Sequence, residues 1–366
     1  MGWYPANQGN GLDRVFYSLV ENEAAGAIRF APIVVTSGAR SDGRIRVVDE
    51  SQPLHSRMRA VARAFDDLRP GADLVAAHFA PYAFSVLRSL GDLPLVVHFH
   101  GPWAAESRME GEGRILTGMK RWLEKRVYHR ADRLIVLSTA FRDVLMQDYG
   151  VDVERVDVVP GGVDLDRFTA APDRRESRRR LDWPLDRPIV LSVRRLVKRM
   201  GLENLLAATE MLKTAVPEIL ILIAGRGPLQ AELQHRIEAL GLQDHVRLLG
   251  FVREEDLPLA YSAADVSVVP TVGLEGFGLI AAESLAAGTP SLVTPVGGLP
   301  EVVSGLSSDL VFDGTTPGAL ADRISAVLLG TLPLPSRDAC RRFAVENFDW
   351  RMVVRRTREV YDRALA

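Results

Sequence analysis

Cysteine is almost absent from this chain of 366 residues, and Cys340 is the only one. Disulfides and metal sites built from several thiolates within the chain are therefore excluded. No apolar run approaches the roughly 20 residues that a membrane-spanning helix requires. The first residues lack the basic and then apolar layout of a signal peptide. These absences predict a protein of a reducing, cytoplasmic compartment.

An excess of charge of either sign is also missing. The formal net charge is -2, which predicts no general attraction to nucleic acid. Lysine occurs only at positions 120, 125, 198 and 213, so arginine supplies nearly all of the positive charge. A chain of this length is too long for one ordinary core, and two domains are expected.

Short aliphatic runs alternate with helical patterns along the whole chain, which predicts α/β architecture with parallel sheets. The run at 219–224 is apolar throughout, as expected of a strand that is buried on both faces of a doubly wound sheet. The expected strands are 33–36, 74–77, 95–99, 133–137, 155–159, 189–193, 220–224, 246–249, 266–269, 290–293 and 309–312. The clearest expected helices are 115–130, 140–148, 202–215, 229–240 and 278–287.

A polar, proline-punctuated connection between Gly161 and Arg187 marks a domain boundary. We expect one Rossmann-like domain at 1–167 and a second at 168–349, facing each other across a cleft. The helix at 350–366 is expected to cross back to the first domain. The chain begins at what reads as the first loop, Pro5–Gly11, so we expect either that the first strand of the N-terminal domain is absent or that the true start lies upstream of Met1.

The most informative segment runs from Glu275 to Glu283. Two carboxylates flank a glycine-bearing turn that opens into an alanine-rich helix. The free backbone N–H groups of such a turn and the positive end of the helix suit a phosphate. A carboxylate on either side can accept hydrogen bonds from sugar hydroxyls. The pattern favours a nucleotide-sugar, and a capped helix with a solvated Glu283 is the alternative.

Around this segment the chain resembles a known family. The ordered motifs that carry the resemblance are 191–201, 223–228, 249–252, 261–265, 275–283 and 289–301, with 131–138 and 158–164 in the first half. They resemble the retaining family-4 glycosyltransferases, which have the GT-B fold. The resemblance spans roughly Gly9 to Tyr361. It implies that the second domain binds the donor and the first binds the acceptor.

The basic loop after the strand at 189–193 is a candidate phosphate site, since forked arginine donors and a lysine suit phosphate oxygens. In the family pattern an arginine before a leucine contacts the diphosphate, and Arg195 matches it. The pattern also has a lysine where this chain has Met200, so Lys198 or Arg199 is expected to replace that charge. Arg194 is a further donor-binding candidate, and a solvated basic loop is the alternative.

The resemblance also assigns the rest of the donor site. Glu275 would hold hydroxyls of the transferred sugar, and Glu283 would hold those of the ribose. The amides around Phe277, Gly278 and Leu279 would assist. The remaining donor-binding candidates are Gly225, where backbone approaches the nucleotide, and the pair Phe251 and Val252 near the base.

In the first domain, His100 ends an expected strand and matches the histidine that faces the donor sugar in the family. His98 is expected to point to the opposite side, into the core. The segment Gly9, Asn10 and Gly11 resembles the family's glycine loop on the acceptor side, with Asn10 in place of a glycine. A simple helix-entry turn is the alternative for that segment.

Two further patterns bear on ligands. Asp164 and Asp166 form a DxD pair, which holds divalent cations in another glycosyltransferase fold, but here we expect no metal and no cofactor. The helix at 115–130 has Leu116, Met119, Leu123 and Val127 on one face and basic residues with Trp122 elsewhere. A basic face with a tryptophan can lie on anionic lipid, at the inner face of a membrane. A solvated face over a packed stripe is the alternative.

We therefore expect a metal-independent glycosyltransferase that moves a sugar from a nucleotide diphosphate donor with retention of configuration. The acceptor would be a glycan, a lipid-linked molecule or a small molecule. The catalytic candidates are Glu275, His100, Arg195 and Lys198. A nucleotide-sugar-binding protein without transferase activity and a GT-B nucleotide-sugar epimerase are the alternatives.

Overall fold

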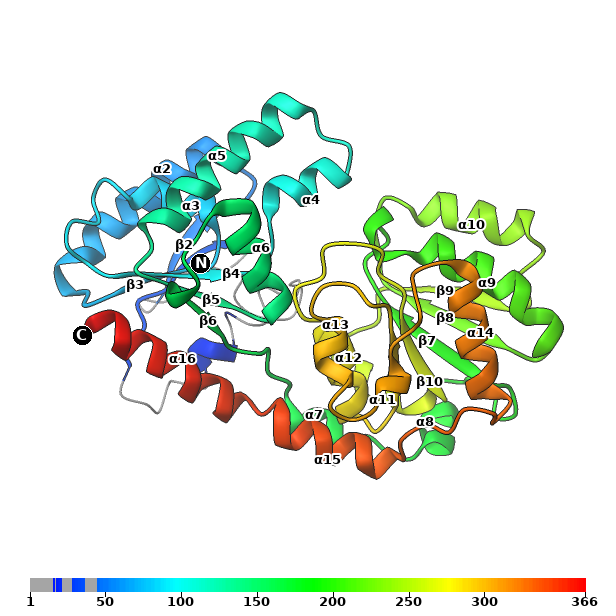
Figure 1. The fold of residues 1–366 in the computed structure, drawn as a ribbon. Coiled ribbons are helices and arrows are strands. Elements are labelled where there is room, and N and C mark those ends of the chain that lie inside the picture. Colours follow the sequence, from blue (N-terminus) through cyan, green and yellow to red (C-terminus); the bar gives the residue numbers. More distant parts are fainter. Residues whose placement is uncertain (1–15, 17, 22–27, 37–44) are drawn as a thin grey trace. The chain divides into compact units, whose positions relative to one another are not determined.

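Strands and helices alternate along the chain as the sequence predicts (Figure 1). The computed structural model describes residues 16, 18–21, 28–36 and 45–366. These residues form two units: those up to Gly162 together with Trp350–Ala366 make the first, and Val163–Asp349 make the second. The expected boundary at 167/168 lies a few residues after this division. The candidates Gly9, Asn10 and Gly11 lie outside the described residues.

The first unit contains a four-stranded parallel sheet of order β3-β4-β5-β6 and a parallel pair, β1-β2. Helices α3 (Ala80–Val86), α5 (Arg114–Arg130) and α6 (Thr139–Tyr149) are seen on one side of the larger sheet (Figure 1). The C-terminal helix α16 (Trp350–Leu365) is seen on the other side. Its strands and helices are β1 (Ile33–Thr36), β2 (Arg46–Asp49), α2 (Leu54–Leu68), β3 (Val75–Ala77), α3 (Ala80–Val86), β4 (Leu95–Phe99), α4 (Trp103–Met109), α5 (Arg114–Arg130), β5 (Arg133–Val136), α6 (Thr139–Tyr149), β6 (Val156–Val158) and α16 (Trp350–Leu365).

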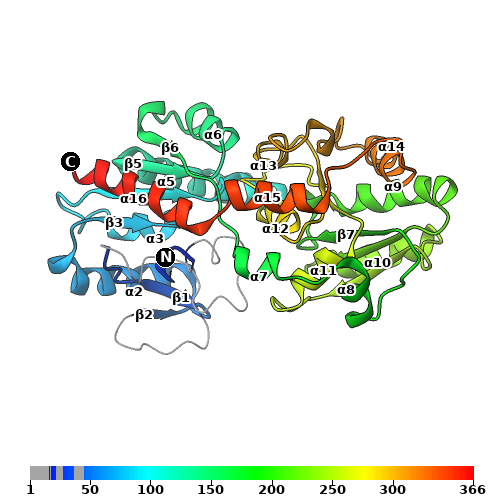
Figure 2. The same cartoon turned by 90° about the horizontal axis from the view of Figure 1, so that it is seen from below.

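The second unit contains a five-stranded parallel sheet of order β11-β10-β7-β8-β9. Helices α9 and α14 lie on one face of this sheet, and α11 and α12 lie on the other (Figures 1 and 2). All five residues of β8 are buried, because helices cover both faces of the sheet. The elements are α7 (Leu165–Thr169), α8 (Arg174–Arg180), β7 (Ile189–Val193), α9 (Leu202–Ala215), β8 (Leu220–Ala224), α10 (Gln230–Ala239), β9 (Val246–Gly250), α11 (Leu257–Ala263), β10 (Val266–Val269), α12 (Leu279–Ala286), β11 (Ser291–Val293), α13 (Leu299–Val303), α14 (Pro317–Leu328) and α15 (Arg337–Asn347).

Two expected elements differ in the structure. The strand expected at 309–312 is wrong, since residues 308–310 form a 3₁₀ turn and only Val311 bridges to Val293. The connection at 161–187 contains two short helices, α7 and α8, which were not predicted from the sequence. Strand β2 was not predicted, since its flanks are rich in charged residues.

The buried face of helix α5 overlaps only in part with the one that the sequence suggests, because Leu123 and Val127 pack into the core but Leu116 and Met119 do not. Its buried residues are Thr117, Glu124, Val127 and Tyr128. Leu116 and Met119, which we expected to pack, are 48% and 63% exposed. The helix packs against α3 and α4, and their position selects the buried face. The described residues include no helix with the length and apolarity needed to cross a bilayer.

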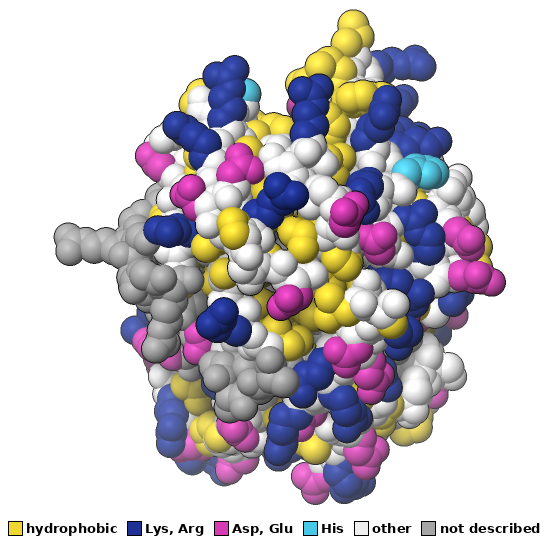
Figure 3. Space-filling model, turned by 90° about the vertical axis from the view of Figure 1, so that its left-hand side faces the viewer, with side chains coloured by type: hydrophobic (Ala, Val, Ile, Leu, Met, Phe, Trp, Pro, Cys, Tyr) yellow, Lys and Arg dark blue, Asp and Glu magenta, His cyan; other side chains and the backbone are white. Residues whose placement is uncertain are grey.

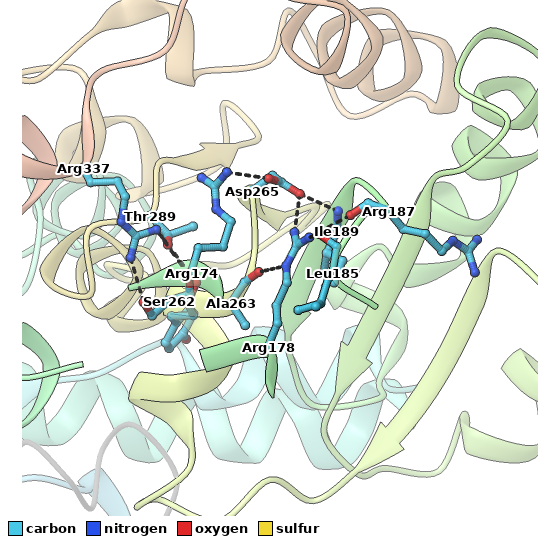
Figure 4. A network of polar contacts seen from close by, with 11 residues as sticks. Arg174, Arg178, Leu185, Arg187, Ile189, Ser262, Ala263, Asp265, Thr289 and Arg337 are labelled. Carbon is cyan, nitrogen blue, oxygen red and sulfur yellow. Dashed lines mark hydrogen bonds and ion pairs between the residues drawn. The ribbon is translucent and has the colours of Figure 1, made fainter. Parts of the chain in front are cut away.

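A buried arginine joins α8 to the sheet of the second unit. Arg178 is 4% exposed and donates to the carboxylate of Asp265 at 2.7 Å and to the carbonyl oxygen of Ala263 at 2.9 Å (Figure 4). The same carboxylate pairs with Arg174 and accepts from the backbone N–H of Ile189. Asp265 precedes β10 and Ile189 opens β7, so one side chain fixes the starts of two neighbouring strands.

Replacing Asp265 with alanine is expected to lower the free energy of unfolding of the second unit by about 3 kcal/mol or more, because it leaves the buried Arg178 charge without its anion. Urea unfolding monitored by circular dichroism measures the change. Arg180→Ala on the same helix removes only an exposed pair with Glu176 and is the matched control. Equal effects of the two substitutions would contradict the assigned role of Asp265.

Candidate active site

The sheet order of the second unit creates a ligand-binding edge between β7 and β10. From β7 the chain proceeds to β8 on one side, and from β10 it proceeds to β11 on the other side. The loops that follow these two neighbouring strands therefore diverge at the carboxyl edge of the sheet. Open α/β sheets bind ligands at such switch points. Residues 194–200 and 270–278, which contain most of the donor-site candidates, occupy these two loops.

Glu275 is held in this position through one of its two carboxylate oxygens. Arg194, which is 8% exposed, donates to Oε2 of Glu275 and also to the hydroxyl of Thr271. The Thr271 hydroxyl donates to the same Oε2 at 3.4 Å. Among the described residues, no hydrogen bond reaches Oε1. The carboxylate is thus fixed by the protein and keeps one oxygen for another partner.

The backbone before Glu275 is held by a second buried arginine. Leu274 adopts a positive φ of 53°, which is uncommon for a residue with a branched side chain. Arg199, 8% exposed, donates to the carbonyl oxygen of Leu274 at 2.6 Å. Arg194 and Arg199 thus both have protein partners within the second unit. Both guanidinium groups support the Glu275 loop.

The other two basic residues of the loop after β7 have a different environment. Arg195 and Lys198 are exposed, and neither makes a side-chain hydrogen bond or ion pair with the described residues. Met200, at the position of the missing lysine, is buried. Of the two residues that we considered as replacements for that lysine, Lys198 is the exposed one.

Glycines allow the loops at this edge to touch through their backbones. Gly225 follows β8 with a φ of 147°, and a Cβ there would lie 1.8 Å from the carbonyl oxygen of Arg194. Gly297 has a φ of 55°, and its Cβ would lie 1.9 Å from the carbonyl oxygen of Glu275. A side chain at Gly225 would push the loop after β8 away from Arg194, and a side chain at Gly297 would push the loop after β11 away from Glu275.

Helix α12 begins directly after this loop. Gly278 precedes it with a φ of 89°, and Leu279 is its first residue. The N–H of Ala281 donates to the carbonyl oxygen of Gly278 at 2.8 Å, which leaves the N–H groups of Leu279 and Ile280 at the start of the helix to bind an anion. Phe277 is buried against Phe348, with ring centroids 5.7 Å apart. Glu283 is also buried, and its Oε2 accepts from the hydroxyl of Tyr261 at 3.2 Å.

Phe251 presents an aromatic ring at the end of β9. It is 48% exposed, and the guanidinium group of Arg226 lies 5.5 Å from its ring centroid. Val252 is half-buried beside it. Since Gly225 donates to the carbonyl oxygen of Gly250 at 2.7 Å, this segment borders the loop after β8.

In the first unit, three histidines stack at the carboxyl edge of the sheet. His78 follows β3, His98 lies near the end of β4, and His100 follows β4 directly. The rings of His78 and His98 lie 4.0 Å apart with an interplanar angle of 13°, and those of His78 and His100 lie 5.2 Å apart. Burial lowers the pKa of all three, to about 3 for His100, so they are neutral.

The expected orientation of His98 is wrong. Alternate residues of a strand share a face, so His98 and His100 point to the same side, and their rings lie 6.3 Å apart. His98 is nevertheless buried, and its Nε2 lies 2.8 Å from the hydroxyl of Tyr361 on α16. His78 was not identified from the sequence, although it follows its strand in the same way that His100 follows β4.

The DxD pair has a local structural use. Asp164 precedes α7, and its side chain accepts from the backbone N–H of Arg167 at 3.2 Å, which caps the helix. Asp166 is exposed within the first turn of that short helix.

Comparison with known proteins decides the family. The sequence model described as Glycosyltransferase Family 4 matches residues 21–167, and the one described as Glycosyl transferases group 1 matches residues 173–346. Together they cover most of both units. The chain belongs to the family-4 glycosyltransferases.

Relatives of this glycosyltransferase include curated bacterial proteins. A D-inositol 3-phosphate glycosyltransferase of Salinispora arenicola is 36% identical over 279 residues, covering 72% of this chain and 60% of that protein. A GDP-mannose-dependent alpha-(1-6)-phosphatidylinositol monomannoside mannosyltransferase of Mycolicibacterium smegmatis is 31% identical and covers 62% of this chain and 61% of that protein. The glycosyltransferase described here thus spans about three-fifths of the length of these relatives.

Solved structures confirm the GT-B fold. Sucrose-phosphate synthase from Thermosynechococcus elongatus superposes with a TM-score of 0.83 at 23% identity, covering 98% of this chain and 96% of that one. The Anabaena protein HepE in complex with UDP-glucose gives a TM-score of 0.79 at 20% identity, covering 98% of this chain and 97% of that one.

The neutral histidines predict how stability depends on pH. Their pKa values are lower in the folded chain than in the unfolded chain, so the unfolded state takes up protons first as the pH falls. Between about pH 7.5 and about pH 5.5, each such histidine should lower the free energy of unfolding by about 1.4 kcal/mol. His78→Phe should reduce this loss, because it removes one of the three buried imidazoles. Urea titrations at the two pH values measure the difference, and an equal pH dependence in His78→Phe and the wild type would refute the assignment.

Proposed function

We propose that this glycosyltransferase moves a sugar from a nucleotide diphosphate donor to an acceptor hydroxyl with retention of configuration, in the cytoplasm and without a metal. The observation that carries the proposal is Oε1 of Glu275, which has no partner among the described residues and lies at the β7–β10 switch point, where the loop after β7 carries the exposed Arg195 and Lys198. A fixed carboxylate oxygen suits a sugar hydroxyl, and the cations suit a diphosphate.

Each candidate residue then has a role in the reaction. Oε1 of Glu275 accepts from hydroxyls of the transferred sugar. Arg195 and Lys198, with the N–H groups at the start of α12, stabilise the negative charge that develops on the diphosphate. Glu283 binds the ribose, and Phe251 and Val252 lie beside the base. His100 is the candidate of the first unit for recognition of the sugar.

In this proposal no side chain acts as a nucleophile, and the sugar keeps its anomeric configuration. The acceptor must therefore attack from the side of the leaving group. The acceptor oxygen forms a bond to the anomeric carbon on the face from which the diphosphate departs. The bond between that carbon and the diphosphate oxygen breaks, and the departing diphosphate takes up the proton of the acceptor hydroxyl. The names of the relatives support a small phosphorylated or a lipid-linked acceptor, and a glycan is a further class within this proposal.

Glu275→Gln is expected to lower turnover by about a hundredfold or more, while nucleotide affinity stays close to that of the wild type, because the amide keeps the shape but loses the anionic acceptor. The donor is first selected from UDP-, GDP-, ADP- and dTDP-sugars by thermal shift. Calorimetry then gives the nucleotide affinity, and product formation with an acceptor panel gives the turnover. Near-normal turnover would contradict the role of Glu275. Glu283→Ala is the complementary variant, because it should weaken binding of the nucleotide itself.

We also propose that the first unit contacts an anionic membrane surface through α5. The face opposite the buried one carries Ile115, Met119 and Trp122, which are 84%, 63% and 54% exposed. Exposed Arg114, Arg121, Lys125 and Arg126 flank this apolar row on the same helix. The only acidic residue of α5, Glu124, is buried and bonded to Tyr149. We call Ile115, Met119 and Trp122 the α5 apolar row.

Exposed apolar side chains beside basic ones favour contact with an anionic membrane over full exposure to water. Exposed apolar side chains gain free energy by entering the headgroup region, and adjacent cations are attracted to anionic lipid. The guanidinium group of Arg126 lies 5.3 Å from the Trp122 ring centroid, so charge and aromatic surface are presented together. Hydrophobic and basic side chains project together at the top of Figure 3, at the height where α5 begins in Figure 1.

Binding to vesicles tests this surface. The wild type should sediment with vesicles that contain about a third anionic lipid, and less so as the salt concentration rises. A variant with Ile115→Asp and Met119→Asp should remain in solution, because carboxylates replace the apolar contacts. Met211→Asp is the matched control, since Met211 is 52% exposed on α9 of the second unit. Equal sedimentation of all three proteins would refute the proposal.

A further inference from the structure

Two of the three stacked histidines, His78 and His100, also contact each other through their ring nitrogens, and this contact has no role in the reaction as proposed above. Nδ1 of His78 lies 3.0 Å from Nε2 of His100, within hydrogen-bonding distance. His78 is 3% exposed, and it is held from its other side by stacking on His98. His98 is in turn within hydrogen-bonding distance of Tyr361 on α16. His100 thus stands at the end of a row of side chains that begins at the C-terminal helix.

The hydrogen-bonding properties of imidazole restrict the tautomers that His78 and His100 can adopt. A neutral imidazole has one nitrogen that donates and one that accepts. For Nδ1 of His78 and Nε2 of His100 to bond, one of the two nitrogens must carry the hydrogen. If His78 donates, both rings carry their hydrogen on Nδ1. If His100 donates, both rings carry it on Nε2. The two histidines must therefore adopt the same tautomer.

The contact also selects the atom of His100 that remains available. Nε2 faces His78, and no hydrogen bond of the described residues involves Nδ1 of His100. A ligand that approaches the ring edge therefore meets Nδ1. Whether that atom donates or accepts is set by the tautomer that the ring shares with His78.

We propose that His78 is a positioning residue for the reaction: its Nδ1 fixes the tautomer and ring orientation of His100, so that Nδ1 of His100 is presented to the donor sugar. The part concerning the sugar rests on the proposed function. The part concerning the tautomer rests only on the geometry of the first unit. His78 does not itself touch the sugar in this scheme, and it acts through His100.

Nuclear magnetic resonance of protein with ¹⁵N-labelled histidine rings tests the tautomer directly, without any substrate. The chain has seven histidines, so the spectrum is simple enough to assign by single substitutions. In the wild type, His100 should show one dominant tautomer, and His78 should show the same one. His78→Phe keeps a flat ring against His98 but removes Nδ1, and the preference of His100 should then be lost.

An internal control is present in the same unit. Nε2 of His129 lies 2.8 Å from the carbonyl oxygen of Tyr149, so this ring must carry its hydrogen on Nε2. The His129 signal should be identical in the wild type and in His78→Phe, which shows that the variant is folded. An unchanged His100 tautomer in a variant that passes this control would overturn the proposal.

Kinetics test the consequence for the reaction. His78→Phe should lower kcat about tenfold or more, with the KM for the donor and the nucleotide affinity nearly unchanged. His78→Asn places an amide near the former Nδ1 and should recover part of the activity. In a His100→Ala background, His78→Phe should have little further effect, because it acts through the missing ring. Independent, additive losses would overturn the positioning role.

If no donor supports turnover in the wild type, the proposed function fails, while the spectroscopic test still decides the role of His78.

Discussion

The ion pair between Arg194 and Glu275 is the interaction on which the proposed site depends. It joins the loop after β7 to the loop after β10, which leave the sheet in opposite directions. The bond from Arg199 to the carbonyl oxygen of Leu274 joins the same two loops a second time. Because Arg194 and Thr271 both bond to Oε2, the pair also orients the carboxylate and leaves Oε1 unpaired among the described residues. Arg199 and the glycines at 225 and 297 keep the surrounding backbone in the shape that this pair requires.

The two units provide different chemistry at the carboxyl edges of their parallel sheets. The second unit presents exposed cations, a fixed carboxylate and the start of a helix, all of which suit a charged and hydroxyl-rich donor. The first unit presents stacked neutral imidazoles, which can exchange hydrogen bonds with a hydroxyl and carry no net charge. This difference agrees with the assignment of the diphosphate to the second unit.

The sequence predicted the fold and the position of the Glu275–Glu283 segment, because both depend on local patterns. Apolar runs gave the bounds of β4, β7, β8 and β10, and the glycine turn gave the start of α12. The roles of Arg194 and Arg199 were not predictable in the same way. Whether a basic side chain faces solvent or turns inward depends on acceptors in a loop that begins more than seventy positions later, such as Leu274 and Glu275. The face that α5 buries likewise depends on α3 and α4, which the helical pattern of α5 does not describe.

The position of α16 has a consequence for how the chain acquires its structure during synthesis. This helix packs on β4 and β5 of the first unit, yet its residues follow the entire second unit in the sequence. A ribosome therefore completes the second unit while one face of the first sheet still lacks its cover. Trp350, whose ring sits against Gly162, and Tyr361, beside His98, arrive only afterwards. The first unit is thus the last to be finished, although it is the first to be made.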